Sequence, residues 1–94
     1  MRDASYTMKR IGLELGGKSP NIILDDADID MAIHQSNFAC FLNSGQFCMA
    51  GTRVFVQEGI YDKFVERAVE AAKNARIGAA FEEGSFNGPL ISQE

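Results

Sequence analysis

Residues 12–19, GLELGGKS, match the pattern G-x-x-x-x-G-K-[ST] of loops that bind nucleotide phosphates. In such a loop the backbone N–H groups surround the phosphates, and the chain then enters a helix. The run NIILDD at 21–26 follows, and its composition is that of the strand that holds magnesium in those proteins. The first hypothesis that these residues suggest is therefore the binding of a nucleotide phosphate.

Three features of the same segment argue against a phosphate loop. Leu13 and Leu15 continue an alternation of apolar and polar residues, which predicts an extended chain where a phosphate loop must curl. Glu14 would place a carboxylate beside the phosphates, and the two negative charges would repel. Pro20 favours extended backbone at Ser19, although a helix should begin there. Phosphate binding is kept only as a weaker alternative.

Two motifs in this chain resemble signatures of the aldehyde dehydrogenase superfamily. LELGGKSPNIIL at 13–24 resembles the glutamate signature, and FLNSGQFCMAGTRVFVQ at 41–57 resembles the cysteine motif N-x-G-Q-x-C-x-A-x-x-R. The residues that match this motif are Asn43, Gly45, Gln46, Cys48, Ala50 and Arg53. The separation of 34 in residue number from Glu14 to Cys48 is also similar to the family's spacing. The resemblance continues to GPLIS near the end of the chain, although it covers a small part of the family's full length.

The resemblance implies the chemistry of aldehyde oxidation. A thiolate adds to the carbonyl carbon, the thiohemiacetal gives up hydride to nicotinamide, and a water activated by a carboxylate hydrolyses the remaining thioester. The family's pattern places the nucleophile at Cys48 and the general base at Glu14. A thiol with a pKa of about 8.5 is mostly protonated near neutral pH, so its surroundings must activate it.

The resemblance also implies an aldehyde substrate and NAD+ or NADP+ as the cofactor. Leu15, Gly16 and Gly17 match the segment beside the nicotinamide ring, where a side chain would block the ring. The backbone N–H of Cys48 matches one donor of the family's oxyanion hole. The asparagine that completes this hole and most of the nucleotide site belong to parts of the family outside this chain. The isolated chain is therefore expected to be inactive.

Three segments are predicted to be strands. KRIGLEL at 9–15 alternates between polar and apolar residues, which predicts a strand that carries Glu14 near its end. NIIL at 21–24 predicts a short buried strand, and RVFVQ at 53–57 is rich in β-forming residues.

Two segments are predicted to be helices. Asp28 is a good N-cap for the first, which Gly45 would end, and its small residues lie at helical spacing. The second is YDKFVERAVEAAKNARIG at 61–78, which Gly78 would end. Its predicted core-facing residues are Ile60, Phe64, Ala68, Ala71 and Ala75. Residues 79–94 lack periodicity and are predicted to be loop.

The order strand, helix, strand, helix predicts an α/β fold with a parallel sheet. Parallel strands are usually covered on both faces, and two helices cannot cover both. The sequence therefore predicts a partial parallel-sheet (βαβα) segment of a catalytic domain. Residues 1–94 would form one partial domain, and the resemblance implies a homo-oligomer for a full-length protein.

Composition and charge narrow the class of protein. The 94 residues carry a net charge of −4, which argues against a nucleic-acid partner or an anionic membrane surface. No apolar run approaches the ~20 residues of a membrane span. Cys40 and Cys48 are too few for a disulfide scaffold, which favours an intracellular location, cytoplasmic or mitochondrial.

The remaining polar residues are interpreted as structural. His34 and two cysteines eight positions apart lack the spacing of a metal site. The four aspartates at 25–30 lack the glycine and closing glutamate of a calcium loop, so helix capping is preferred and no metal is expected. Cys40 is predicted to be a packing residue, and Arg53 to hold its loop by hydrogen bonds.

A second hypothesis about function is that the chain is not an enzyme. The chain could be a non-catalytic, truncated remnant that at most packs against full-length subunits. Such a remnant would fold poorly alone, because a domain of this size buries a modest share of its surface. The third hypothesis, the weakest, is nucleotide binding through residues 12–19.

Overall fold

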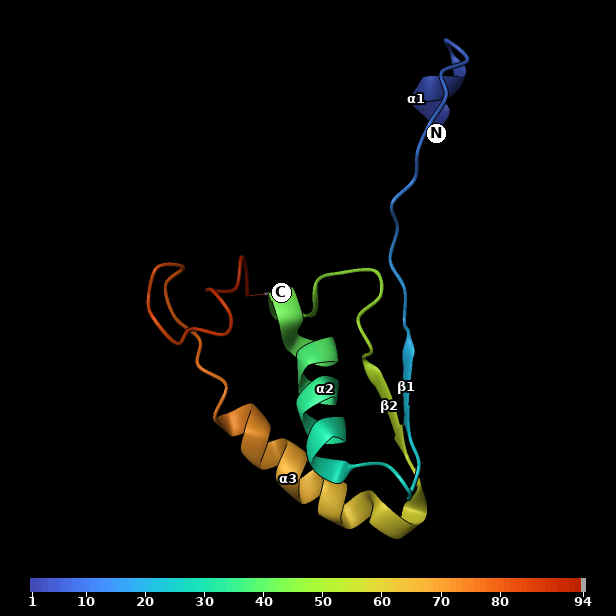
Figure 1. The fold of residues 1–94 in the computed structure, drawn as a ribbon. Coiled ribbons are helices and arrows are strands. Elements are labelled where there is room, and N and C mark those ends of the chain that lie inside the picture. The colour runs from blue at the N-terminus through green and yellow to red at the C-terminus, as the bar shows by residue number, and fades with distance from the viewer. Residues whose placement is uncertain (94) are drawn as a thin grey trace.

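The computed structural model describes residues 1–93 as a β-α-β-α unit with a long N-terminal arm (Figure 1). A short helix in the arm precedes two strands and two longer helices. In chain order these elements are α1 (Arg2–Ser5), β1 (Pro20–Ile23), α2 (Ile29–Phe41), β2 (Arg53–Val56) and α3 (Tyr61–Lys73).

Strands β1 and β2 form a two-stranded parallel sheet, as the order of elements predicts. Pro20 pairs with Arg53 and Ile23 pairs with Val56. The α/β fold class and the parallel pairing are therefore confirmed. Asn21 donates from Nδ2 to Oγ of the buried Ser36 at 2.9 Å, which joins β1 to α2.

Helix α2 begins where the sequence predicts. Oδ1 of Asp28 accepts hydrogen bonds from the N–H groups of Asp30 and Met31 at 3.0 and 3.1 Å, so Asp28 is the N-cap. The predicted end at Gly45 is wrong, because α2 ends at Phe41. The backbone of the following residue, Leu42, leaves the helical region, and a 3₁₀ turn occupies Leu42–Gly45.

Helix α3 is also shorter than predicted, since it ends at Lys73 and not at Gly78. The residues after it pair with the C-terminal tail instead of continuing the helix. The carbonyl of Arg76 accepts from the N–H of Phe86 at 2.8 Å, and Ile77 forms a parallel bridge with Asn87. Residues 79–93 otherwise form the predicted loop, and Glu94 lies outside the described residues.

The core lies between one face of the sheet and the two helices. Ile23, Ile33 and Phe64 form its buried centre. The predicted core-facing stripe of α3 is confirmed at Phe64, and Ile60, Ala68 and Ala71 pack against the same cluster. Ala75 lies beyond the end of α3 and is exposed.

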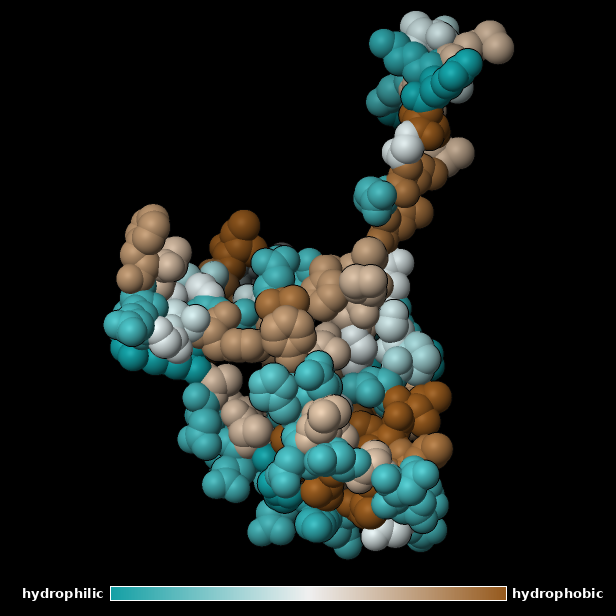
Figure 2. All heavy atoms as spheres, viewed as in Figure 1, coloured by the Kyte–Doolittle hydropathy of each residue, from teal (hydrophilic) through white to brown (hydrophobic). Residues whose placement is uncertain are grey.

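The opposite face of the sheet is open. Ile22 and Phe55 are register partners on this face, and they are 68% and 51% exposed. Figure 2 shows hydrophobic side chains gathered over the strands. Two helices cover one face of this sheet and leave the other bare, as the sequence predicts.

The strand predicted at residues 9–15 is wrong. The segment forms part of an arm that runs away from the helices (Figure 1), and Ile11, Leu13 and Leu15 are about half exposed or more. A strand needs a neighbour for its backbone hydrogen bonds, and within the described residues nothing pairs with this segment. The arm gives the molecule a radius of gyration of 17.8 Å, against about 13 Å for a compact domain of this size.

Candidate functional site

Cys48 lies in a loop, residues 46–50, that is tied to helix α2 on its C-terminal side. The N–H of Gly51 donates to the carbonyl of Ala39 at 3.1 Å, and Sγ of Cys40 donates to the carbonyl of Gly51 at 3.0 Å. The loop is called here the cysteine loop, and Gly51, the residue that follows it, is held against the end of α2 by these two bonds. Cys48 itself is exposed.

A left-handed turn fixes the other end of the cysteine loop. Asn43, Ser44 and Gly45 have φ angles of 52°, 58° and 71°. A side chain on Gly45 would place its Cβ 2.9 Å from the carbonyl oxygen of Cys40, so glycine is required there. The N–H of Gln46 then donates to the carbonyl of Asn43 at 3.1 Å, which starts the loop.

Gly17 packs directly against the cysteine loop. A Cβ on Gly17 would overlap the carbonyl oxygen of Cys48. A close approach at this glycine is predicted from the sequence, and the neighbour in the structure is the backbone of Cys48. A Cβ on Gly16 would meet no atom within 4 Å, so the backbone of Gly16 faces open space.

The two motifs together line one hollow of about 350 Å³. Residues 15–18 form one side and residues 45–48 form the other, with Ala50 and Thr52 completing the wall. The structure thus brings Cys48 together with Leu15, Gly16 and Gly17. It leaves Glu14 outside, because Glu14 is an exposed residue of the arm and does not line the hollow.

Arg53 joins the two motifs by hydrogen bonds. Its Nε donates to the carbonyl of Lys18 at 2.9 Å, which confirms the prediction that Arg53 holds the loop. The guanidinium also lies 5.6 Å from the ring centroid of Phe55, on the open face of the sheet.

The surroundings of Lys18 and Ser19 do not suit a phosphate loop. The chain continues from them into strand β1, whereas a phosphate cradle requires the N-terminus of a helix. Nζ of Lys18 donates to the carbonyl of Gly17 at 3.3 Å and is exposed. The match of residues 12–19 to the phosphate pattern is therefore accidental.

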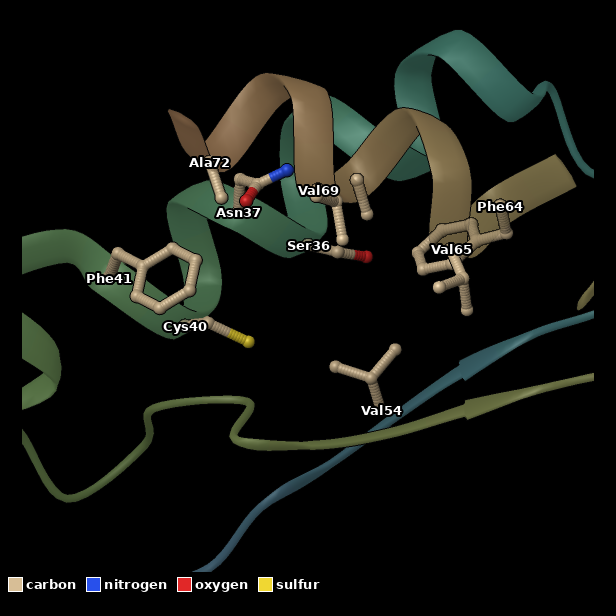
Figure 3. Close-up of a pocket in the computed structure, with 10 residues that line it drawn as sticks. Ser36, Asn37, Cys40, Phe41, Val54, Phe64, Val65, Val69 and Ala72 are labelled. Atoms are coloured by element: carbon tan, nitrogen blue, oxygen red, sulfur yellow. The ribbon is translucent and has the colours of Figure 1, made fainter. Parts of the chain in front are cut away.

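The second thiol, Cys40, lies in an apolar groove between α2, α3 and β2 (Figure 3). The groove has a volume of about 270 Å³, and Val54, Phe64 and Val69 are among its walls. Burial raises the pKa of the Cys40 thiol above its ordinary range. The predicted packing role of Cys40 is confirmed by this position and by its bond to Gly51.

The side chain of Asn87 lies against the turn at Leu42–Gly45, and its role is not predicted from the sequence. Its Nδ2 donates to the carbonyl of Phe41 at 2.8 Å, and its Oδ1 accepts from the N–H of Ser44 at 3.2 Å. No periodicity marks this residue in the tail. Only its amide, which can donate and accept at once, hints at such a role.

Residues 1–93 lack the features of a metal site or of a membrane-spanning helix in two respects. They hold no cluster of three or more histidine, cysteine or acidic side chains that could bind a metal ion. None of their helices has the length and apolar character needed to cross a membrane.

Comparisons with known proteins agree with the motifs. The model of the aldehyde dehydrogenase family matches residues 1–94. An aldehyde dehydrogenase of Emericella nidulans is 57% identical over 90 residues, which are 96% of this chain and 18% of that protein. The mitochondrial aldehyde dehydrogenase of Homo sapiens is 54% identical over 89 residues, which are 95% of this chain and 17% of that protein.

Solved structures agree with the fold. Betaine aldehyde dehydrogenase from Staphylococcus aureus, in complex with NAD+, is 40% identical and superposes with a TM-score of 0.87. The match covers 98% of this chain and 18% of that one. The chain thus spans about a fifth of the proteins it matches.

Proposed function

The chain belongs to the aldehyde dehydrogenase family, and we propose that it is part of the catalytic domain of a longer NAD(P)+-dependent aldehyde dehydrogenase. That longer protein is called here the complete enzyme. The observation that carries the proposal is the hollow in which residues 15–18 of one signature meet residues 45–48 of the other. An exposed thiol on a loop that is tied down at both ends suits a nucleophile.

Cys48 is proposed to attack the aldehyde. Its sulfur forms a bond to the carbonyl carbon, and the carbonyl oxygen becomes an oxyanion that the backbone N–H of Cys48 stabilises. Loss of hydride from this carbon leaves a thioester on Cys48. The anchoring of the cysteine loop supports this role, since a nucleophile must be held within reach of the carbonyl.

NAD+ or NADP+ is proposed to bind beside Leu15, Gly16 and Gly17 and to supply the hydride acceptor. These residues fit the flat nicotinamide end, because the backbone of Gly16 is bare and faces open space. The Staphylococcus aureus neighbour was solved with NAD+. We place the rest of the cofactor site in the parts of the family that this chain does not span.

Glu14 is proposed to activate the water that hydrolyses the thioester. It directly precedes Leu15, which lines the hollow, although Glu14 itself is exposed on the arm. Contacts between the arm and other parts of the complete enzyme would fix the position of Glu14. The exposed apolar side chains on the arm support such contacts.

Replacement of Glu14 by glutamine separates the two proposed roles. In the complete enzyme, Glu14→Gln should still release one equivalent of NAD(P)H per active site in a rapid burst, because hydride loss precedes hydrolysis. Steady turnover should then fall by about 100-fold or more, since general base catalysis contributes that much. A stopped-flow record without a burst and with unchanged turnover would remove Glu14 from the mechanism.

The open sheet face favours a second candidate, a non-catalytic remnant. Only Ile23, Ile33, Ala50 and Phe64 are buried apolar residues within the part of the chain that the structure describes. So small a core is marginal alone. A remnant would bury Ile22 and Phe55 against a full-length subunit, and it would not oxidise aldehydes.

A further inference from the structure

The side chain of Asn87 bridges the end of helix α2 and the turn that leads to Cys48. Its Nδ2 supplies a donor to the carbonyl of Phe41, one of the helix-end carbonyls that α2 leaves unpaired. Its Oδ1 accepts from the N–H of Ser44. One amide therefore holds both sides of the turn at Leu42–Gly45.

Asn87 is itself held in place from two directions. The N–H of Gly78 donates to the carbonyl of Asn87 at 3.0 Å, which fixes the backbone against the chain after α3. The preceding residue, Phe86, packs edge-on against Phe38 of α2, with ring centroids 6.5 Å apart. The amide thus reaches the turn from a backbone that is already ordered.

The turn needs such support. Asn43 and Ser44 both adopt left-handed backbone conformations, which are unfavourable for residues other than glycine and are tolerated better by asparagine than by serine. Such conformations persist only where neighbouring groups impose them. The bond from Asn87 to the N–H of Ser44 acts directly on one of these residues.

We propose that Asn87 is a positioning residue for the nucleophile Cys48. This inference rests on the proposed function, because it concerns the reaction in which Cys48 is the nucleophile. Asn87 holds the left-handed turn, the turn sets where the cysteine loop begins, and Cys48 is thereby kept at the hollow. Asparagine is suited to this position because the two contacts require a donor and an acceptor on one short side chain.

The test compares Asn87→Ala and Asn87→Asp in the complete enzyme. Alanine removes both hydrogen bonds, and aspartate keeps the acceptor for Ser44 but turns a carboxylate oxygen toward the carbonyl of Phe41. For both variants we expect kcat to fall by about ten-fold while the KM for the aldehyde stays within about two-fold. The control is Glu83→Ala in the same tail, whose side chain is exposed and makes no hydrogen bond within residues 1–93.

Hydrogen exchange supplies the readout that separates positioning from folding. The amides of residues 44–48 should exchange about ten-fold faster in Asn87→Ala, while those of β1 and β2 should not change. Faster exchange throughout the chain, or an unchanged kcat, would overturn the inference. If the parent protein oxidises no aldehyde, the proposed function is refuted. The structural part of the inference, that Asn87 holds the turn, is refuted separately if the amides of residues 44–48 exchange at the same rate in Asn87→Ala as in the parent.

Discussion

Two thiols in one short chain have opposite surroundings. Cys48 is exposed at a hollow lined by both family signatures, whereas Cys40 is half-buried in an apolar groove and donates to a backbone carbonyl. Burial disfavours the thiolate and raises the pKa of Cys40, so this thiol stays protonated at a pH where an ordinary thiol ionises. The pair thus offers a candidate nucleophile and a matched structural cysteine.

The contact between Gly17 and Cys48 gives a prediction at the residue scale. In the complete enzyme, Gly17→Ala should lower kcat by about 10- to 100-fold, because the new methyl group must displace the carbonyl of Cys48. Gly12→Ala is the control, since a Cβ there would meet no atom within 4 Å. Steady-state kinetics would contradict the account if the two variants retained equal kcat.

At the scale of elements, the cysteine loop is held from three sides. Helix α2 receives the N–H of Gly51, the tail holds the turn through Asn87, and Arg53 at the start of β2 bonds to Lys18. Each of these three hydrogen bonds joins residues that are far apart in the sequence. The loop's shape is therefore a property of the assembled β-α-β unit and not of the motif alone.

The cap of α2 gives a prediction at this scale. Asp28→Ala should make the first-turn amides of α2, which include Met31, exchange about five-fold faster, because loss of an N-cap costs about 1 kcal/mol. Asp26→Ala is the control, since its side chain is exposed and makes no hydrogen bond within residues 1–93. Equal exchange rates in the two variants would show that the helix start does not depend on the cap.

Sequence patterns predict the elements whose signals are local. Asp28 is recognisable as a cap because its acceptor serves the next turn, and the apolar period of α3 identifies Phe64 as core. Two helix ends are missed, since Leu42 leaves the helix ahead of the left-handed turn, and Arg76 pairs with the tail. Neither helix end is marked by an apolar period, because one depends on a backbone turn and the other on pairing with Phe86 in the tail.

The candidate site likewise has features that the sequence predicts and features that it does not. The family resemblance predicts that Leu15, Gly16 and Gly17 bind the cofactor, which remains a prediction. In the structure these three residues line one hollow with Cys48. The strand predicted for residues 9–15 requires a partner that residues 1–93 do not provide, so alternation alone is not sufficient. Asn87 could not be predicted because its role depends on the tail folding back onto α2.

At the scale of the whole molecule, apolar surface remains uncovered in several places. The arm, the outer face of the sheet and the groove between the helices each expose large hydrophobic side chains, among them Leu15, Phe55 and Val69. We propose that further parts of a catalytic domain cover them. The extents of 56 × 34 × 21 Å agree with an open unit of this kind.

The isolated chain gives a prediction at this scale. We expect no aldehyde-dependent NAD(P)H formation from it, because most of the proposed cofactor site lies elsewhere in the family. Calorimetry should show a broad, weak melting transition, since the buried core is small. A sharp transition, or measurable turnover by the chain alone, would show that residues 1–94 form a self-sufficient unit.

The most direct measurement concerns the nucleophile. In the complete enzyme, Cys48→Ala should reduce aldehyde-dependent NAD(P)H formation by about 10,000-fold or more, because removal of a catalytic nucleophile has effects of that size. Cys40→Ala should keep a kcat near that of the parent, with a modest loss of thermal stability from its partly buried site. Turnover retained in Cys48→Ala, or lost only in Cys40→Ala, would contradict the assignment of Cys48.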